Sequence, residues 1–205
     1  MIKNIVIFIL GIIMVGCYPE FTNPLSEPLE SKVDERLLGT WYIKDGKEVG
    51  YLHIERRLDN LTNITIIEGD ENRVKIDKES MYTMFASKIG NSFYMNLQDD
   101  SLRENNKYVI VKYLINDKEE LFIWMMDNQQ FAKDIESNRL SGEVPKKRFS
   151  PAQITDSTSA LTTYLSSADH SSAFYLLGKF KKIVNTSSDI NVPNKRCSGL
   201  GKSAR

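Results

Sequence analysis

Apolar and polar residues alternate in short segments through residues 33–184 of this 205-residue chain. In one segment Leu52 and Ile54 are flanked by polar neighbours, and similar segments follow it. A period of two with one apolar face is typical of an antiparallel strand that is half buried against a core. Connections such as Gly90-Asn91 favour hairpins between these segments. The pattern therefore predicts a mainly β (α+β) domain of about eight antiparallel strands.

Residues with turn chemistry separate the segments, because Gly, Asn and Asp adopt turn conformations at low cost. They occur at Lys44-Asp45-Gly46-Lys47, Glu68-Gly69-Asp70, Gly90-Asn91 and Asn116-Asp117-Lys118. We expect each of these places to be a turn between two strands. A strand that begins near Trp41 and another that ends near Val184 are then placed to meet, which closes the sheet into a barrel.

Two segments before the last strand predict helices. The first begins at Asp127, whose carboxylate is expected to cap the backbone while Gln130 reaches back. Its apolar face is Phe131 and Ile135. The second begins after Ser157, and its apolar residues have the spacing of one helical stripe: Leu161, Tyr164, Leu165 and Ala168.

The segments 108–115 and 121–126 differ from the others because they are apolar on both faces. Strands with this composition are buried on both sides of their sheet. We therefore expect the two helices to cover this part of the sheet from outside, while its other face lines the barrel.

The stretch Leu37-Leu38-Gly39-Thr40-Trp41-Tyr42 resembles the opening of a lipocalin-type (calycin) barrel. In that family a Gly-x-Trp follows a short helical turn and starts the first strand, with the tryptophan at the closed end. Over residues 33–184 the chain more closely resembles a group of uncharacterised bacterial lipoproteins. The entry into the second helix, Ile154-Thr155-Asp156-Ser157 followed by Leu161, matches that group. The resemblance implies a lipocalin-like barrel and a location in the cell envelope, and it implies no catalytic reaction.

The last strand departs from the lipocalin pattern. Lipocalins commonly place an arginine there, over the tryptophan, whereas this chain offers Lys179, Lys181 and Lys182. The Thr-Asp-Tyr segment of lipocalins is also absent from the sequence. Two interpretations of Trp41 therefore stay open, namely the plug of a lipocalin-like barrel and an ordinary core tryptophan.

Residues 1–16 combine Lys3 with an apolar run over residues 5–15. As a helix this run extends about 16 Å, well short of a hydrocarbon core about 30 Å thick, and it is typical of a signal peptide. The segment ends in Met14-Val15-Gly16-Cys17, which resembles the lipobox of bacterial lipoproteins. The resemblance implies cleavage before Cys17, a diacylglyceryl cysteine and acylation, for example by palmitate, of the new amino terminus. The alternative is a plain signal peptide and an incidental cysteine.

A lipid anchor at Cys17 implies attachment to a membrane of the cell envelope. Tyr18, rather than an aspartate, follows the cysteine and favours the outer membrane if the cell has one. Residues 17–32 contain several prolines and little periodicity, and we interpret them as a flexible tether. Residues 185–205 are interpreted as a disordered basic tail. This tail holds Cys197, which is unpaired once Cys17 is acylated.

The sequence offers little for catalysis. Its 27 basic and 27 acidic side chains are balanced, which argues against a nucleic-acid partner. The only histidines are His53 and His170, and the two cysteines lie near opposite ends, so no metal-ligand spacing occurs. Asp169-His170-Ser171 has the composition of a hydrolytic triad, but adjacent residues do not normally aim three side chains at one point. We predict no enzyme activity, no catalytic residues, no metal site and no cofactor.

Two hypotheses about function remain. The first, which we favour, is a structural or interaction lipoprotein that binds another envelope component or a host protein. The second is a carrier that holds a small apolar or amphipathic ligand inside the barrel. The residues expected to face inward are all large: Ile54, Ile66, Phe93, Val111 and Ile123. Large inward residues favour a filled interior and therefore the first hypothesis.

Overall fold

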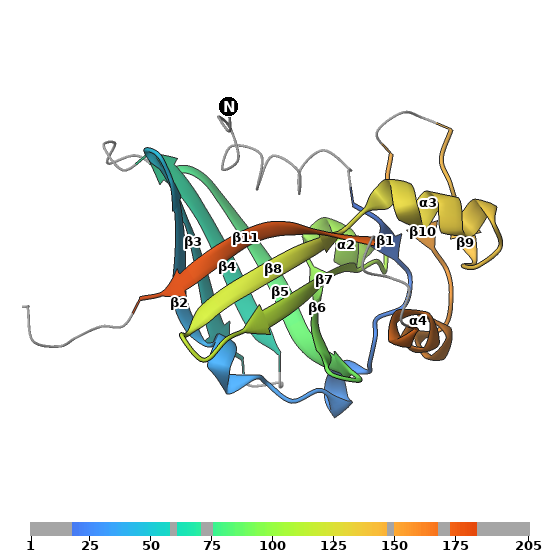
Figure 1. The fold of residues 1–205 in the computed structure, drawn as a ribbon, viewed down its shortest axis with the longest axis horizontal. Helices are drawn as coiled ribbons and strands as arrows, with labels where there is room; N and C mark the ends of the chain where they lie inside the picture. Colours follow the sequence, from blue (N-terminus) through green and yellow to red (C-terminus); the bar gives the residue numbers. More distant parts are fainter. Residues whose placement is uncertain (1–17, 58–60, 71–75, 147–149, 168–172, 184–205) are drawn as a thin grey trace, which may run out of the picture.

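The computed structural model describes residues 18–57, 61–70, 76–146, 150–167 and 173–183. Its main body is a closed antiparallel barrel in which eight strands pair in the order β11-β2-β3-β4-β5-β6-β7-β8 (Figure 1). The strands are β2 (Gly39–Asp45), β3 (Glu48–Arg56), β4 (Thr62–Asp70), β5 (Ile76–Ile89), β6 (Ser92–Gln98), β7 (Val109–Ile115), β8 (Glu120–Met126) and β11 (Phe174–Lys182). The predicted eight-stranded, lipocalin-like barrel is therefore confirmed.

The last strand closes the barrel, as the sequence predicted. β11 pairs with β8 along most of its length, and its end pairs with β2, where Lys182 is opposite Trp41. Its register against β8 shifts between Leu176 and Gly178, which marks a bulge. A bulge bends a strand and increases its twist. The register between β11 and β2 covers only Lys181 and Lys182, so a short ladder closes the barrel.

The end of the barrel where β2 begins and β11 ends is filled by Trp41 and the 3-10 turn η2 (Glu35–Leu37). Trp41 is fully buried, and its indole N–H donates a hydrogen bond of 2.7 Å to the Leu37 carbonyl. The Lys182 ammonium lies 5.1 Å from the centroid of the indole. A lysine thus makes the cation–π contact for which lipocalins commonly use an arginine. We call this end the closed end.

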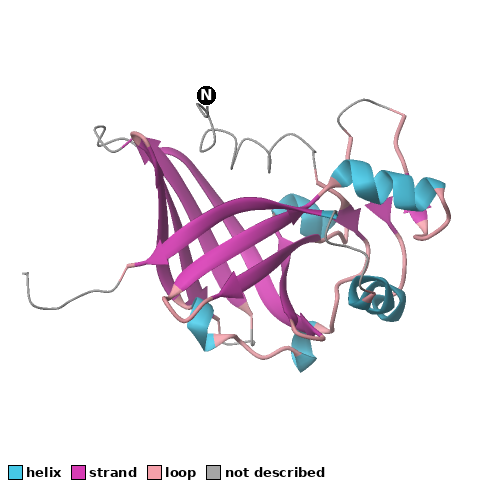
Figure 2. Cartoon of the chain, viewed as in Figure 1, coloured by secondary structure: helices cyan, strands magenta, loops and turns pink. Residues whose placement is uncertain are grey.

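A second layer packs against the outside of the barrel, to the right in Figure 2. It contains the helices α3 (Asn128–Glu136) and α4 (Thr158–Ser166) and a small sheet of β1 (Glu20–Phe21), β10 (Gln153–Ile154) and β9 (Gly142–Glu143). Asp127 and Ser157 cap the two helices by accepting hydrogen bonds from backbone N–H groups, as predicted. The Gln130 side chain does not reach back to the cap, because it donates to Asp134 at 3.1 Å.

The second layer has a hydrophobic core of its own. Phe131 of α3 and Leu161 of α4 share this core with Ile110 of β7 and Met126 of β8. Ile110 and Met126 are therefore covered by the second layer. The cover that the apolar sequences predicted is confirmed only at this end of the two strands, because outward side chains further along, such as Leu114 of β7, are exposed.

The flexible tether predicted for residues 17–32 is wrong from Tyr18 onward, where the structure describes the chain. Phe21 is fully buried, and its backbone exchanges hydrogen bonds with the chain just before β7. Leu25 is also buried and donates its N–H to the Asn96 side chain at 2.8 Å. The apolar side chains of this segment hold it against the barrel, which composition alone did not indicate.

Two smaller expectations also fail. Glu68-Gly69-Asp70 is the end of β4 rather than a turn, and the register against β5 shifts beside Gly69. The helix α2 (Asp100–Glu104) is absent from the prediction, because five residues are too short to show an apolar stripe. Asp99 caps it by accepting a hydrogen bond of 2.7 Å from the N–H of Leu102.

Several predictions fall outside the described residues. These are the signal peptide over residues 1–16, the lipid attachment at Cys17, the tail over residues 185–205 and the segment around His170. They stay predictions. Within the described ranges, no helix combines the length and the apolar character that crossing a bilayer requires.

Candidate functional site

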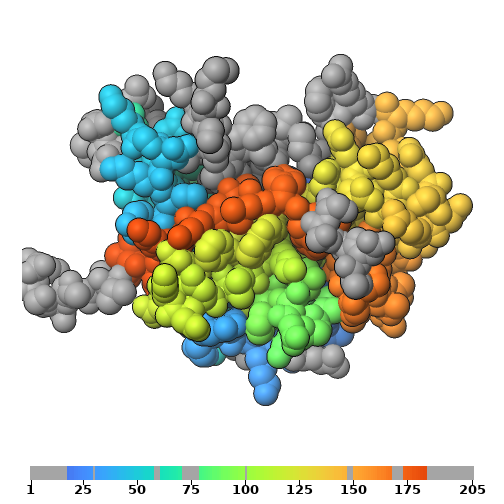
Figure 3. Space-filling model, in the orientation of Figure 1, coloured from blue at the N-terminus to red at the C-terminus, as the bar shows by residue number. Residues whose placement is uncertain are grey.

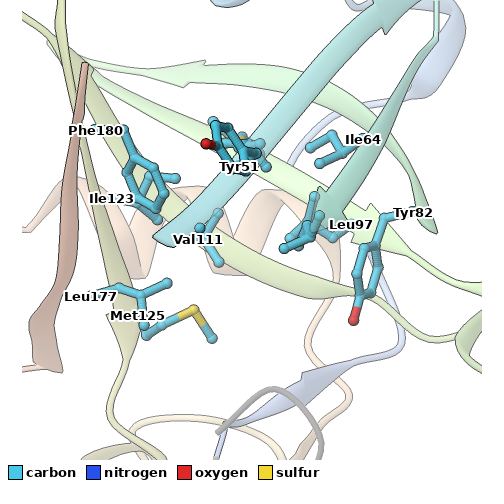
Figure 4. Close-up of a pocket in the computed structure, with 13 residues that line it drawn as sticks. Tyr51, Ile64, Tyr82, Leu97, Val111, Ile123, Met125, Leu177 and Phe180 are labelled. Carbon is cyan, nitrogen blue, oxygen red and sulfur yellow. The ribbon is translucent and has the colours of Figure 1, made fainter. Parts of the chain in front are cut away.

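The interior of the barrel contains a cavity of only about 50 Å³. Figure 4 shows side chains of several strands, including Val111, Leu177 and Phe180, around this space. The five residues predicted to face inward all belong to this core or pack against it: Ile54, Ile66, Phe93, Val111 and Ile123. Ligand pockets usually measure about 300–1,000 Å³. The interior is therefore filled, as the sequence favoured.

Two glycines let a side chain of β2 occupy part of this interior. A Cβ atom on Gly178 would lie 2.9 Å from Cδ1 of Ile43, and one on Gly50 would lie 3.0 Å from Cγ2. Both distances are shorter than normal carbon–carbon contacts. Ile43 thus takes the space that a side chain at either glycine would need, so the glycines contribute to packing rather than to a ligand cavity.

A larger concavity of about 420 Å³ lies at the closed end. One side is the chain over residues 26–36, which includes the turn η1 (Pro28–Glu30) and runs from β1 to β2 along the lower edge of Figure 1. The other side is formed by the end of β5, the start of β6 and a residue of β7. We call it the closed-end groove, and it is lined by Ser26, Ser31, Lys32, Val33, Asp34, Arg36, Ala86, Ser87, Lys88, Phe93 and Tyr113.

Hydroxyl groups form one wall of the closed-end groove. The Ser26 Oγ lies 2.9 Å from the Ser31 Oγ and 2.5 Å from the Ser87 Oγ. The Asn96 side chain, which is fully buried, donates to Ser87 at 2.8 Å and to the backbone carbonyl of Phe85 at 3.2 Å. Because a buried amide needs its partners, Asn96 holds Ser87 of β5 in place from the neighbouring strand β6.

A carboxylate, a guanidinium and a phenol meet at the second wall. Arg36 donates to both oxygens of Asp34, at 2.9 and 2.6 Å, and the Tyr113 hydroxyl donates to Asp34 at 2.9 Å. Burial disfavours ionisation of Asp34, but the hydrogen bonds from Arg36 and Tyr113 outweigh it and lower the pKa of the carboxyl group. Burial, followed by the charge of Asp34, raises the pKa of Tyr113. The carboxylate is therefore ionised and neutralised within its own wall.

Cations surround the aromatic part of the groove. Arg36 lies 4.9 Å and the Lys88 ammonium 5.5 Å from the centroid of the Phe93 ring. Lys32 is a further exposed cation in the lining. Three cations face one carboxylate, Asp34, so the lining carries an excess of two positive charges.

The outer face of β7, β8 and β11 carries a band of apolar side chains that we call the aromatic ladder: Leu114, Phe122, Trp124 and Leu176. Cross-strand pairs join Leu114 to Phe122 and Trp124 to Leu176. The rings of Phe122 and Trp124 stack with centroids 5.9 Å apart, and Leu114 and Leu176 are about half exposed. Figure 3 shows the yellow-green surface of β8 beside the orange-red surface of β11 on this face.

Lysines border the aromatic ladder. Lys112 is opposite Trp124 in the sheet. Lys179 lies 5.6 Å from the Phe122 ring centroid and forms an ion pair of 2.7 Å with Glu120. Exposed apolar patches with a polar rim are typical of protein interaction sites.

Asp134, the buried carboxylate of the second layer, has a structural explanation. It is 1% exposed and accepts hydrogen bonds from Gln130, Arg139 and Tyr164. These contacts tie α3 to α4. Burial, followed by the hydrogen bond to Asp134, raises the pKa of Tyr164, so the phenol stays a donor.

The sequence-based candidates do not assemble into a catalytic centre within the described residues. His53 is exposed on β3, and its Nδ1 lies 2.9 Å from the Thr40 hydroxyl. No group of three or more His, Cys, Asp or Glu side chains in the described ranges is placed to hold a metal ion. Cys17 lies outside these ranges.

Sequence reasoning missed the closed-end groove. Its charged residues come from two distant segments, Asp34 and Arg36 before β2 and Lys88 at the end of β5. The only local signal is the acid–base pair two residues apart, and such pairs are common on surfaces. No model of a protein family, no curated protein and no solved structure matches the chain.

Proposed function

We propose that the protein is a lipoprotein of the cell envelope, anchored through lipid at Cys17, whose barrel is a non-catalytic interaction module for another protein of the envelope or of a host. The observation that carries the proposal is the filled interior, with a cavity of about 50 Å³. A carrier needs a cavity several times larger. The aromatic ladder supplies an outer surface for binding instead.

The chemistry of the aromatic ladder supports a protein partner. Trp, Tyr and Phe are enriched in the buried centres of protein interfaces, and the rim around them is polar. Here Phe122 and Trp124 form the centre, while Lys112 and Lys179 stand at the rim. The partner that fits is a protein with an apolar segment and acidic residues beside it.

The fold also supports the place of the anchor. Tyr18 packs against the barrel core and Glu20 belongs to β1, so the proposed lipid at Cys17 is attached directly beside the body of the protein. The anchor therefore joins near the start of β7, whereas the closed-end groove lies near Tyr113 at its other end. A barrel anchored in this way lies close to the bilayer.

Labelling with a palmitate analogue tests the anchor. We expect label on the full chain and none on Cys17→Ser, because only the thiolate of Cys17 is at the lipobox position. Cys197→Ser is the matched control and should keep the label. Equal labelling of the wild type and Cys17→Ser would disprove the lipoprotein half of the proposal.

Site-specific photo-crosslinking in cells tests the interaction. A photoreactive residue in place of Trp124 should give a discrete adduct, and one in place of Glu55, which is exposed on the outer face of β3, should not. Lys112→Glu should reduce the adduct at position 124, because it reverses a charge at the rim. Identical adducts from positions 124 and 55, insensitive to Lys112→Glu, would contradict the proposed surface.

A further inference from the structure

The closed-end groove has the size of a ligand site, whereas the barrel interior does not. Its volume is about 420 Å³ and that of the interior cavity is about 50 Å³. Small-molecule sites usually measure about 300–1,000 Å³. The groove therefore has room for a molecule about as large as a monosaccharide with one acidic group.

The cations of the groove have unused donor capacity. Among the described residues, neither Lys32 nor Lys88 has a carboxylate partner. Arg36 uses its Nε and Nη2 on Asp34. A guanidinium has five N–H groups, so others stay available. Three cations with free donors and one internally satisfied carboxylate are suited to a carboxylate or phosphate group.

The serine wall offers acceptors rather than donors, because the direction of each hydrogen bond follows from its neighbours. Ser31 donates to the Glu27 carbonyl at 3.0 Å, so the contact between Ser26 and Ser31 requires Ser26 as the donor. The contact between Ser26 and Ser87 then requires Ser87 as the donor, and Ser87 accepts from Asn96. Every hydroxyl proton is used, and each oxygen keeps a second lone pair. Such a wall fits the hydroxyl groups of a ligand.

We propose that the closed-end groove binds a small hydroxylated organic acid, a sugar phosphate or sugar carboxylate, either free or at the end of a glycan. Its acidic group contacts Lys32, Arg36 and Lys88, and its hydroxyl groups donate to the serine wall. The aromatic ladder lies on another face and does not take part. The inference is independent of the anchor at Cys17.

Titration calorimetry on the full chain in detergent tests the proposal with four probes: glucose 6-phosphate, glucuronate, glucose and inorganic phosphate. We expect the two acidic sugars to bind at least about tenfold more tightly than glucose or phosphate, because only they use both walls. Affinity should fall as salt is added, since the cations are exposed. Glucose binding as tightly as glucose 6-phosphate would overturn the role of the cations. Inorganic phosphate binding as tightly as glucose 6-phosphate would overturn the role of the serine wall.

Variants that replace a lysine with glutamine test whether the ligand binds in the groove. Lys88→Gln should weaken glucuronate binding about fivefold, and the double variant Lys32→Gln/Lys88→Gln about twentyfold. Both lysines are exposed, so these variants should unfold at the wild-type denaturant concentration. Lys133→Gln, an exposed lysine on α3, is the matched control and should bind like the wild type. Unchanged affinity in the double variant would place the ligand elsewhere and overturn the proposal.

A further titration distinguishes the two possible sources of the ligand. Free glucuronate is compared with a short oligosaccharide that ends in glucuronate, on the same preparation of the protein. Tighter binding of the free acid supports a soluble metabolite, and tighter binding of the oligosaccharide supports a glycan end. Binding of neither probe at millimolar concentration contradicts the proposal.

Discussion

The barrel interior and the closed-end groove are built from neighbouring residues of the same strands, yet only the groove has room for a ligand. On β7, Val111 helps to fill the interior, and Tyr113, two residues further, lines the groove. The cavity volumes are about 50 and 420 Å³. Every strand sends side chains inward, so large residues fill the interior from all sides. At the closed end only the segment before β2 covers the strands, and it leaves a gap.

This difference shows that an eight-stranded barrel does not by itself indicate a carrier. A barrel of this size has an interior that side chains can fill or that can hold one ligand. The outcome depends on the inward residues, which are large here, and on Gly50 and Gly178, which admit Ile43. Binding chemistry then belongs at the ends and on the outer face of the barrel.

The largest expected effect comes from Phe180→Ala, which opens the interior. Phe180 is 5% exposed and borders the small cavity. Its truncation should lower the free energy of unfolding by about 3–5 kcal/mol, because a buried ring is lost and a cavity stays behind. The enlarged apolar cavity should bind benzene, which raises the melting temperature of the variant alone.

Phe122→Ala is the control for that change, since Phe122 lies on the outer face in the aromatic ladder. The change should lower the free energy of unfolding by about 1 kcal/mol, the value of an aromatic pair with little burial. Benzene should not raise the melting temperature of this variant. Benzene stabilising the wild type as much as Phe180→Ala would mean that the native interior is already a ligand cavity, and the comparison between the two regions would fail.

Asn96→Ala should have the next largest effect, because it removes the side chain that fixes the serine wall. Asn96 is fully buried and makes hydrogen bonds with Leu25, Phe85 and Ser87. Its loss leaves buried polar groups without partners, which we expect to cost about 2–3 kcal/mol in urea unfolding. The control Asn63→Ala, whose side chain makes an exposed contact with Glu55, should cost less than about 0.5 kcal/mol. Equal losses of unfolding free energy in the two variants would show that Asn96 does not support the groove.

The sequence predicts the barrel well because strand patterning and turn chemistry are local signals. The alternation around Leu52 and Ile54 and the caps at Asp127 and Ser157 all agree with the structure. The prediction of a flexible tether is wrong for the opposite reason, because the burial of this segment depends on non-local packing. Phe21 is an isolated apolar residue among prolines, and only the fold reveals the second-layer core that buries it.

The candidate site is less accessible to sequence reasoning than the fold. The groove needs Ser26 and Ser31 to meet Ser87, which is more than fifty residues away, and no periodicity connects them. Its charged residues look like ordinary surface charge in the sequence. Function at such a place depends on which side chains the topology brings together, and that information is not local.

Asp34→Asn should have a smaller effect that depends on pH. The folded protein lowers the pKa of Asp34, so its stabilising contribution is present above the unfolded value of about 3.9 and is lost as pH falls through the folded pKa. At pH 7 the variant should be about 1–2 kcal/mol less stable than the wild type. The difference should shrink below about pH 4, as urea unfolding at several pH values would measure. A difference that is constant from pH 7 to pH 2.5 would show that the charge of Asp34 contributes nothing.

The smallest effect should come from Lys182→Gln, at the contact between the two regions. The ammonium of Lys182 lies 5.1 Å from the Trp41 ring centroid and donates at 3.1 Å to the carbonyl of Arg36. Removing the charge should cost about 0.5–1 kcal/mol, the value of an exposed cation–π contact. In a Trp124→Phe background, the fluorescence emission reports Trp41 alone, because the chain has two tryptophans.

Lys182→Arg is the matched variant, because a guanidinium can replace the ammonium over the indole. It should keep the stability and the emission of the parent, whereas Lys182→Gln should change both. The same two variants test which of the two regions Lys182 affects. If the emission of Trp41 changes and the affinity for glucuronate does not, Lys182 stabilises the barrel interior and not the groove. If Lys182→Gln and Lys182→Arg have the same stability and the same emission, the contact with Trp41 has no energetic role. The stability of the closed end then depends on η2 and the buried indole alone.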